Sequence, residues 1–272
     1  MRRFATAVFL SVSLAHAGAI IGQWDGDGKA ILTDNGNISW NYANTSYTYS
    51  TNLVHSLMAG YGATIGPDAP ITAANLAGYD SFVIRIPAAA PTSGEISALS
   101  DWVSAGGLLL MFADSSMSTD PFNVILAGIG STMAMGGTVN QNFFYTPGLF
   151  LTNGIVDSWV SPTVGIGVVG GTSLTRGGAT WTTAQQAQAA AYIHFQQMGL
   201  GYVVVFADTI DVNYVLNANG SALDRMFQNI AGYSNPHGAT STPVTSDIPE
   251  PRNVLLMCVG LATVVFFRRA LH

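Results

Sequence analysis

The sequence has little cysteine and little charge, and each shortage excludes a class of chemistry. The only cysteine, Cys258, lies in an apolar stretch near the C-terminus. The rest of the chain therefore has no disulfide, no thiolate metal site and no cysteine nucleophile. Only 9% of the residues are charged, Lys29 is the single lysine, and the formal net charge is -6. Because nucleic-acid binding needs a basic patch, this composition excludes it.

Motifs of catalysis and of cofactor binding are also missing. The nucleophile-elbow pattern Gly-x-Ser-x-Gly does not occur, and no glycine pair has the spacing of a phosphate-binding loop. Residues 25–28, Asp-Gly-Asp-Gly, begin like a calcium loop, but Lys29 stands where the third ligand belongs. These motifs therefore predict neither a cofactor nor a metal ion.

Ser115 follows an apolar run and is the nearest candidate for a nucleophile. An enzyme would need a histidine beside it, yet His55 falls in an expected helix, His194 in an expected strand and His237 in an expected linker. We interpret Ser115 as a cap or turn hydroxyl. The alternative is a secreted hydrolase or polysaccharide-modifying enzyme that uses Ser115 or the strand-end aspartates Asp34, Asp114 and Asp208.

The first 17 residues have the three parts of a secretory signal peptide. Arg2 and Arg3 form a positive n-region, residues 4–14 are an apolar h-region, and Ala15-His16-Ala17 matches the small-x-small cleavage pattern. The sequence thus predicts export through the translocon, removal of residues 1–17, and a mature chain that starts near Gly18 or Ala19.

The last 24 residues form a second segment of the same kind. A Pro-Glu-Pro triplet precedes the uncharged run 254–267, and two arginines follow it. That run is shorter than the ~20 residues that span a hydrocarbon core. Its flanking prolines and arginines nevertheless favour a single short membrane helix over the alternative, a C-terminal core helix. The arginines beyond the run place the C-terminus on the cytoplasmic side.

This tail, residues 249–272, resembles the PEP-CTERM sorting signal. The residues that carry the resemblance are Pro249, Glu250, Pro251, Arg268 and Arg269. The resemblance implies that a membrane protease of the exosortase type processes the tail in a Gram-negative bacterium. It also implies that the protein is held transiently in the inner membrane by its tail. The protein then reaches the cell surface or extracellular matrix, where exopolysaccharide is a partner.

The residues between these two ends, 18–233, predict an α/β domain. The β-branched run 81–86 ends at Pro87, and Thr92 with Glu95 has the spacing of a capping box at a helix start. Apolar residues follow at helical spacing, and then the continuous apolar run 108–113 fits a strand buried on both faces. Strand, helix and strand in this order predict a βαβ unit with a right-handed crossover.

A similar strand pattern returns late in the chain. The run 202–207 resembles the run 108–113. A strand is expected before it at 190–195, and a hairpin turn at 198–201 connects the two strands. A helix is expected at 221–233, a further strand at 30–34 and a further helix at 52–61. The whole pattern resembles class I glutamine amidotransferase-like (flavodoxin-like) domains, many of them non-enzymatic, without their catalytic cysteine. It implies a mostly parallel open sheet with flanking helices.

Two segments differ from this core. Residues 116–183 are rich in Gly, Thr, Ser and Asn with short alternating pieces, which predicts a β-rich insertion of hairpins. Residues 234–248 have no periodicity and predict a flexible linker between the domain and the tail. The stretch 40–49 combines aromatic rings and amides, the groups that bind sugars, although a tyrosine-rich edge loop is the commoner explanation.

Three aspartates follow expected strands: Asp34, Asp114 and Asp208. In an open parallel sheet, ligands bind beyond the carboxyl ends of the strands, so these carboxylates are the candidate ligand-binding residues, for Ca²⁺ or a sugar. The simpler interpretation, which we favour, is that each caps the next turn or helix. Together the sequence predicts an exported, surface-sorted, non-catalytic structural or interaction module of an exopolysaccharide layer.

Overall fold

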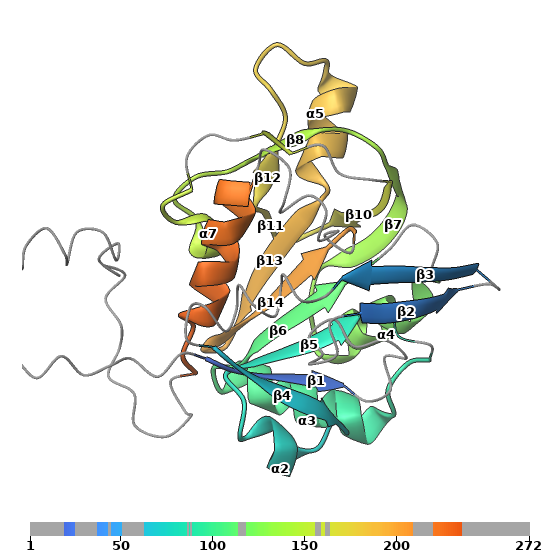
Figure 1. The fold of residues 1–272 in the computed structure, drawn as a ribbon, viewed down its shortest axis with the longest axis vertical. Helices are drawn as coiled ribbons and strands as arrows, with labels where there is room; N and C mark the ends of the chain where they lie inside the picture. Colours follow the sequence, from blue (N-terminus) through green and yellow to red (C-terminus); the bar gives the residue numbers. More distant parts are fainter. Residues whose placement is uncertain are drawn as a thin grey trace, which may run out of the picture. The chain divides into compact units, whose positions relative to one another are not determined.

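The computed structural model describes residues 19–24, 37–42, 45–50, 63–85, 87, 89–113, 118–155, 159–160, 164–208 and 220–235. These residues form a mixed α/β domain built on a largely parallel sheet (Figure 1). The predicted signal peptide, the strand at 30–34, the helix at 52–61 and the sorting tail lie outside the described residues. Among the helices that are described, none is long and apolar enough to cross a membrane.

The main sheet has seven strands. Their spatial order is β11 (Thr172–Ser173), β13 (Ile193–Met198), β14 (Gly201–Phe206), β6 (Leu108–Phe112), β5 (Ser81–Arg85), β1 (Ile20–Trp24) and β4 (Thr64–Ala69). The five strands from β14 to β4 are parallel, while β13 and β11 run antiparallel at one edge. Numbered along the chain, the parallel strands are arranged 2-1-3-4-5. The predicted α/β class with a mostly parallel sheet is confirmed.

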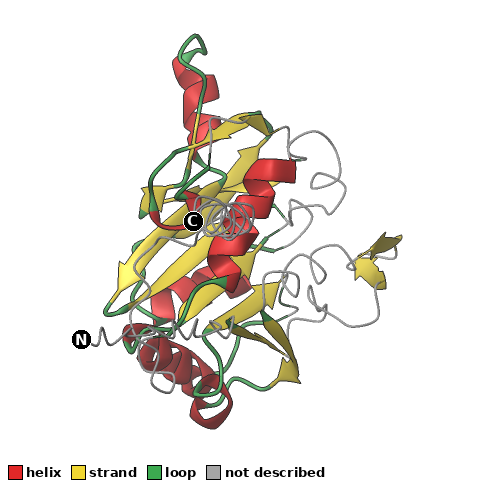
Figure 2. Ribbon diagram, turned by 60° about the vertical axis from the view of Figure 1, so that its left-hand side comes forward, coloured by secondary structure: helices red, strands yellow, loops and turns green. Residues whose placement is uncertain are grey.

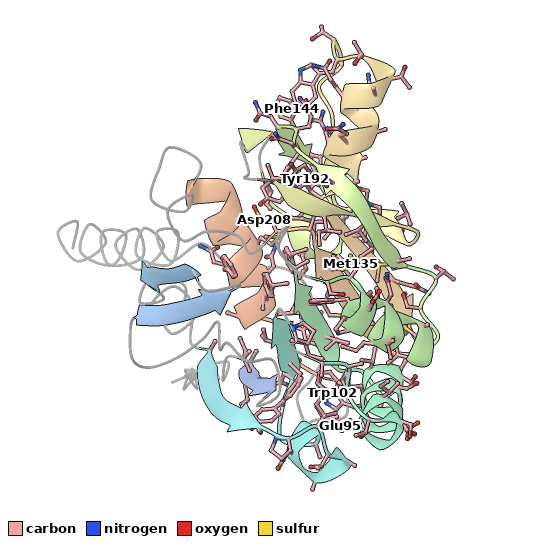
Figure 3. All side chains as sticks on the ribbon, turned by 90° about the vertical axis from the view of Figure 1, so that its right-hand side faces the viewer. Glu95, Trp102, Met135, Phe144, Tyr192 and Asp208 are labelled. Atoms are coloured by element: carbon pink, nitrogen blue, oxygen red, sulfur yellow. The ribbon has the colours of Figure 1, made fainter. Side chains whose placement is uncertain are left out.

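Helices flank both faces of the sheet (Figure 3). On one face lie α2 (Ala73–Leu76), α3 (Ser93–Ser104) and α4 (Asp120–Gly128), and on the other lie the short 3-10 helix η1 (Phe150–Thr152) and α7 (Gly220–Ala231). In Figure 2, α7 is the helix that crosses the strands near the centre of the view. The expected capping box is present at the start of α3, where Thr92 and Glu95 bond each other's backbone amides.

The predicted βαβ unit forms as β5, α3 and β6, and β14 pairs with β6 on its other side. Leu110 is the register partner of Val204, and both side chains are fully buried. All five residues of β6 are buried because helices cover the sheet on both faces. This burial on both faces explains why residues 108–112 form a continuous apolar run in the sequence.

The hairpin between β13 and β14 turns against the end of α3. Gly199 has φ +62°, and a Cβ on it would lie 2.4 Å from the carbonyl oxygen of Ser104. The amide of Leu200 donates to that same oxygen at 2.9 Å. Only glycine fits this turn, because both the backbone angle and the close approach exclude a side chain.

The predicted insertion at 116–183 contains more helix than expected. Its strands are β7 (Ala134–Val139), β8 (Phe143–Tyr145), β9 (Trp159–Val160), β10 (Gly165–Val169), β11 and β12 (Thr175–Arg176). Its helices are α4 and η1, and α5 (Thr183–Ala190) begins at its end. The strands pair across distance, β7 with β10 and β12 with β8, so the segment is not a series of local hairpins.

Candidate functional site

The carboxyl ends of three parallel strands meet at one edge of the main sheet, where the sequence predicts a ligand site. Arg85, Phe112 and Phe206 stand side by side as the last residues of β5, β6 and β14. The rings of Phe112 and Phe206 stack with centroids 4.2 Å apart and planes 5° apart. Two packed rings therefore end β6 and β14, each two residues before a predicted aspartate, Asp114 and Asp208.

Asp208 follows β14 and is 8% exposed. The backbone just before it is held from two sides, because the Ala207 amide donates to Tyr192 and the Ala207 carbonyl accepts from Ile166, both at 2.7 Å. Gly165 lies so close that a Cβ there would be 2.6 Å from the Ala207 oxygen. Asp208 thus lies in a fixed and covered position, which fits a structural role better than an open ligand site.

The other predicted members of the site, Asp34, Asp114 and Ser115, lie outside the described residues. The shared cation that these aspartates would hold therefore remains a hypothesis. Within the described part of the chain, no three His, Cys, Asp or Glu side chains are grouped as metal ligands.

His194 is the one histidine that the structure describes, and it lies in β13 as expected. Its Nδ1 is 2.6 Å from the carbonyl oxygen of Gly170 and its Nε2 is 2.7 Å from that of Ala190. The Ser173 hydroxyl donates to the same Ala190 oxygen at 2.6 Å. Both ring nitrogens face backbone carbonyls, so this imidazole joins the turn at Gly170 and the end of α5 to β13. It is not placed as a general base.

The opposite edge of the sheet carries an arrangement that the sequence did not predict. The Asp80 carboxylate accepts from the Ile20 amide through Oδ2 and from the Asn235 amide through Oδ1, both at 2.8 Å. The Ala19 amide donates to the Ala231 carbonyl at 2.8 Å. We call Asp80, Ile20 and Asn235 the Asp80 clamp. It joins the start of β1 to the segment after α7, although the two are distant in sequence.

A second unpredicted feature is a small aromatic surface on the sheet β12-β8-β9. Phe143 and Tyr145 of β8 point into the core, so Phe144 between them points to the opposite side. The Phe144 ring lies 5.7 Å from the Trp181 ring at 44°, and the Arg176 guanidinium lies 5.2 Å from its centroid. Three aromatic residues in a row in one strand, Phe143 to Tyr145, were the sequence signal for it, because one of them must point away from the core.

Comparison with known proteins bears on the fold. No family model and no curated protein matches the chain significantly. Among solved structures, the N-terminal domain of mmIFT52 matches with a TM-score of 0.53 and 13% identity, over 78% of this chain and 97% of that one. The cytoplasmic protein STM3548 from Salmonella typhimurium matches with a TM-score of 0.50 and 11% identity, over 80% and 99%. At such identities the similarity shows the α/β fold alone, because one fold serves many functions.

Proposed function

We propose that the protein is an exported, surface-sorted and non-catalytic module of an exopolysaccharide layer. The observation that carries this proposal is the Asp80 clamp. The first residues after the predicted signal peptide and the last residues before the predicted tail bind one carboxylate. The two ends of the described domain are therefore joined at one carboxylate, as suits a globular module that is tethered at one point.

The clamp also agrees with the predicted cleavage site. Ala19 is buried and its amide is bonded to the end of α7, so cleavage after Ala17 would remove the leader without cutting into β1. At the other end, Asn235 is buried, which extends the packed domain two residues into the predicted linker. Residues 236–248 remain as the proposed spacer between the domain and the tail at 249–272.

We propose further that the core has flavodoxin-like topology, of the kind found in amidotransferase-like domains. The 2-1-3-4-5 order of the parallel strands supports this assignment. In that topology the strand order reverses between β1 and β5, and the crevice at their carboxyl ends is the place for a ligand. The engagement of His194 by two backbone carbonyls supports a non-catalytic role.

The proposed partners are the export translocon, an exosortase-type protease and the inner membrane, which the tail enters before the protein reaches the surface. Intact-mass analysis of surface material from the native host tests this route. We expect loss of about 17 residues at the front and loss of the tail after Pro251. Surface protein that still contains residues 254–267 would contradict processing by an exosortase.

Charge reversal at the end of the tail gives a sharper test. Arg268→Glu with Arg269→Glu should reduce the surface-delivered fraction severalfold, because the positive side then no longer favours the cytoplasm. Arg252→Glu is the matched control, since it removes a positive charge from the outer flank and leaves the orientation unchanged. Equal delivery of both variants would contradict the predicted orientation.

A further inference from the structure

We propose that Phe144, Trp181 and Arg176 form a binding platform for a neutral polysaccharide. We call these three residues the aromatic platform. The inference rests on the proposed function and deepens it, because it names the ligand class of the interaction module and the surface that takes it. The platform lies beside α5, at the opposite end of the described domain from the start of β1 and the end of α7 (Figures 1 and 3).

The register of the small sheet places Phe144 beside Arg176, and Trp181 packs on Phe144 from outside the sheet. Phe144 is the partner of Arg176 in β12 on one side and of Trp159 in β9 on the other. Phe144, Arg176 and Trp181 are all half-buried, so a part of each remains open to solvent. The solvent-exposed parts of flat aromatic rings offer an apolar surface on which the apolar face of a sugar ring can pack.

Trp181 is held in place before any ligand arrives. A Cβ on Gly178 would lie 2.9 Å from the indole ring, so the ring rests directly on this backbone. The Trp181 amide donates to the Gly178 carbonyl at 3.0 Å, and the Trp181 carbonyl accepts from Gln186 at 3.0 Å. Such preorganisation lowers the entropy that binding costs.

The charge distribution decides which ligand fits. Between Asp120 and Asp208 the sequence contains two residues with a formal charge, Asp157 and Arg176. Arg176 is the only charged residue in the described parts of 134–190, and its guanidinium already faces the Phe144 ring. The helix α5, which begins just after Trp181, carries exposed amides at Gln185, Gln186 and Gln188, and that of Gln186 donates to the Trp181 carbonyl. A surface of rings, amides and hydroxyls suits a neutral polyhydroxylated chain, whereas a polyanion would need several cations.

Affinity electrophoresis of the purified full chain in mild detergent tests the proposal. The gels contain dextran or guar galactomannan as neutral polysaccharides, or alginate as a polyanion. We expect at least one neutral polysaccharide to retard the wild type and alginate to leave it unretarded. Trp181→Ala and Phe144→Ala should each weaken binding about tenfold or more, and Trp181→Phe should retain an intermediate affinity.

Phe195→Ala is the matched control, because it removes a half-buried ring elsewhere in the domain. It should bind like the wild type, and thermal unfolding checks that every variant is folded. The proposal is overturned if neither neutral polysaccharide retards the wild type, if both alanine variants bind unchanged, or if alginate binds more tightly. These outcomes are separate from the mass of the processed protein, so failed binding and failed sorting are distinguishable.

Discussion

At the scale of single residues, Tyr145 carries a polar group in an apolar place. Its side chain is fully buried, and its hydroxyl has no hydrogen-bond partner among the described residues. The ring contributes to the core by packing edge-on against Phe143 with centroids 5.5 Å apart. A buried hydroxyl without a partner costs free energy, so the ring stabilises this position while its oxygen destabilises it.

Tyr145→Phe should therefore raise the free energy of unfolding, by roughly 0.5–1.5 kcal/mol. Tyr192→Phe is the matched control, because the buried Tyr192 hydroxyl accepts from the Gln141 amide at 3.0 Å and its loss should destabilise. Urea unfolding of both variants measures the difference. Destabilisation by Tyr145→Phe would show that the hydroxyl has a partner that the described residues do not reveal.

The same tyrosine gives a pH signature. Burial raises the pKa of Tyr145 above its ordinary value, so the unfolded chain ionises near pH 10 while the folded chain stays neutral there. The stability of the wild type should therefore fall as pH rises above about 10, with a slope of up to about 1.4 kcal/mol per pH unit from this group. Tyr145→Phe should make that slope shallower. An unchanged slope would contradict the assignment.

At the scale of elements, the strands and helices that the sequence predicts correctly are those whose apolar residues are buried by neighbouring elements. The run 108–113 and the face of α3 are correct because burial on both faces selects apolar residues continuously. The helix α7 is also correct, with Met226, Phe227 and Ile230 buried as expected. For the candidate site, the sequence correctly placed Asp208 beyond a buried strand, but it did not predict that Asp208 is buried or that Ala207 before it is held by Gly165 and Ile166.

Elements that depend on distant partners were missed. β1 contains Gly22, whose Cβ position is occupied by the Tyr79 ring at 2.5 Å, and such a glycine looks like a turn from sequence alone. β4 contains Gly66, Pro67 and Asp68, residues that belong in turns but are tolerated on an edge strand. α4 begins at Asp120-Pro121, a start signal hidden in a segment rich in glycine and threonine.

Leu110→Ala tests the central pair of strands. It should cost roughly 2–5 kcal/mol, because it removes burial and leaves a cavity against Val204. Val124→Ala is the control, since Val124 is 45% exposed on α4 and should change stability by less than about 0.5 kcal/mol. Chemical denaturation gives both values. A small loss at Leu110 would mean that β6 is not a central strand.

At the scale of the whole molecule, the Asp80 clamp joins the two ends of the described domain, the start of β1 and the segment after α7. Asp80→Ala leaves the amides of Ile20 and Asn235 without their acceptor, and hydrogen bonds to charged groups contribute about 1.5–3 kcal/mol each. We expect a marked loss of stability and faster hydrogen exchange at both amides. Asp101→Ala, on the exposed side of α3, is the control. Equal exchange rates in both variants would argue against the clamp.

The same clamp constrains the order in which the chain can be synthesised and folded. β1 lies between β4 and β5. Its first amide, that of Ile20, bonds the Asp80 carboxylate, and the preceding Ala19 amide bonds the carbonyl of Ala231 at the end of α7. The first strand of the described domain is thus held by its last described helix, a pattern of distant contacts that slows folding. A chain whose N-terminus emerges first cannot complete this domain until residue 235 has also emerged. For the export proposed above, this order of folding means that the polypeptide stays threadable until nearly the whole described domain has passed the translocon.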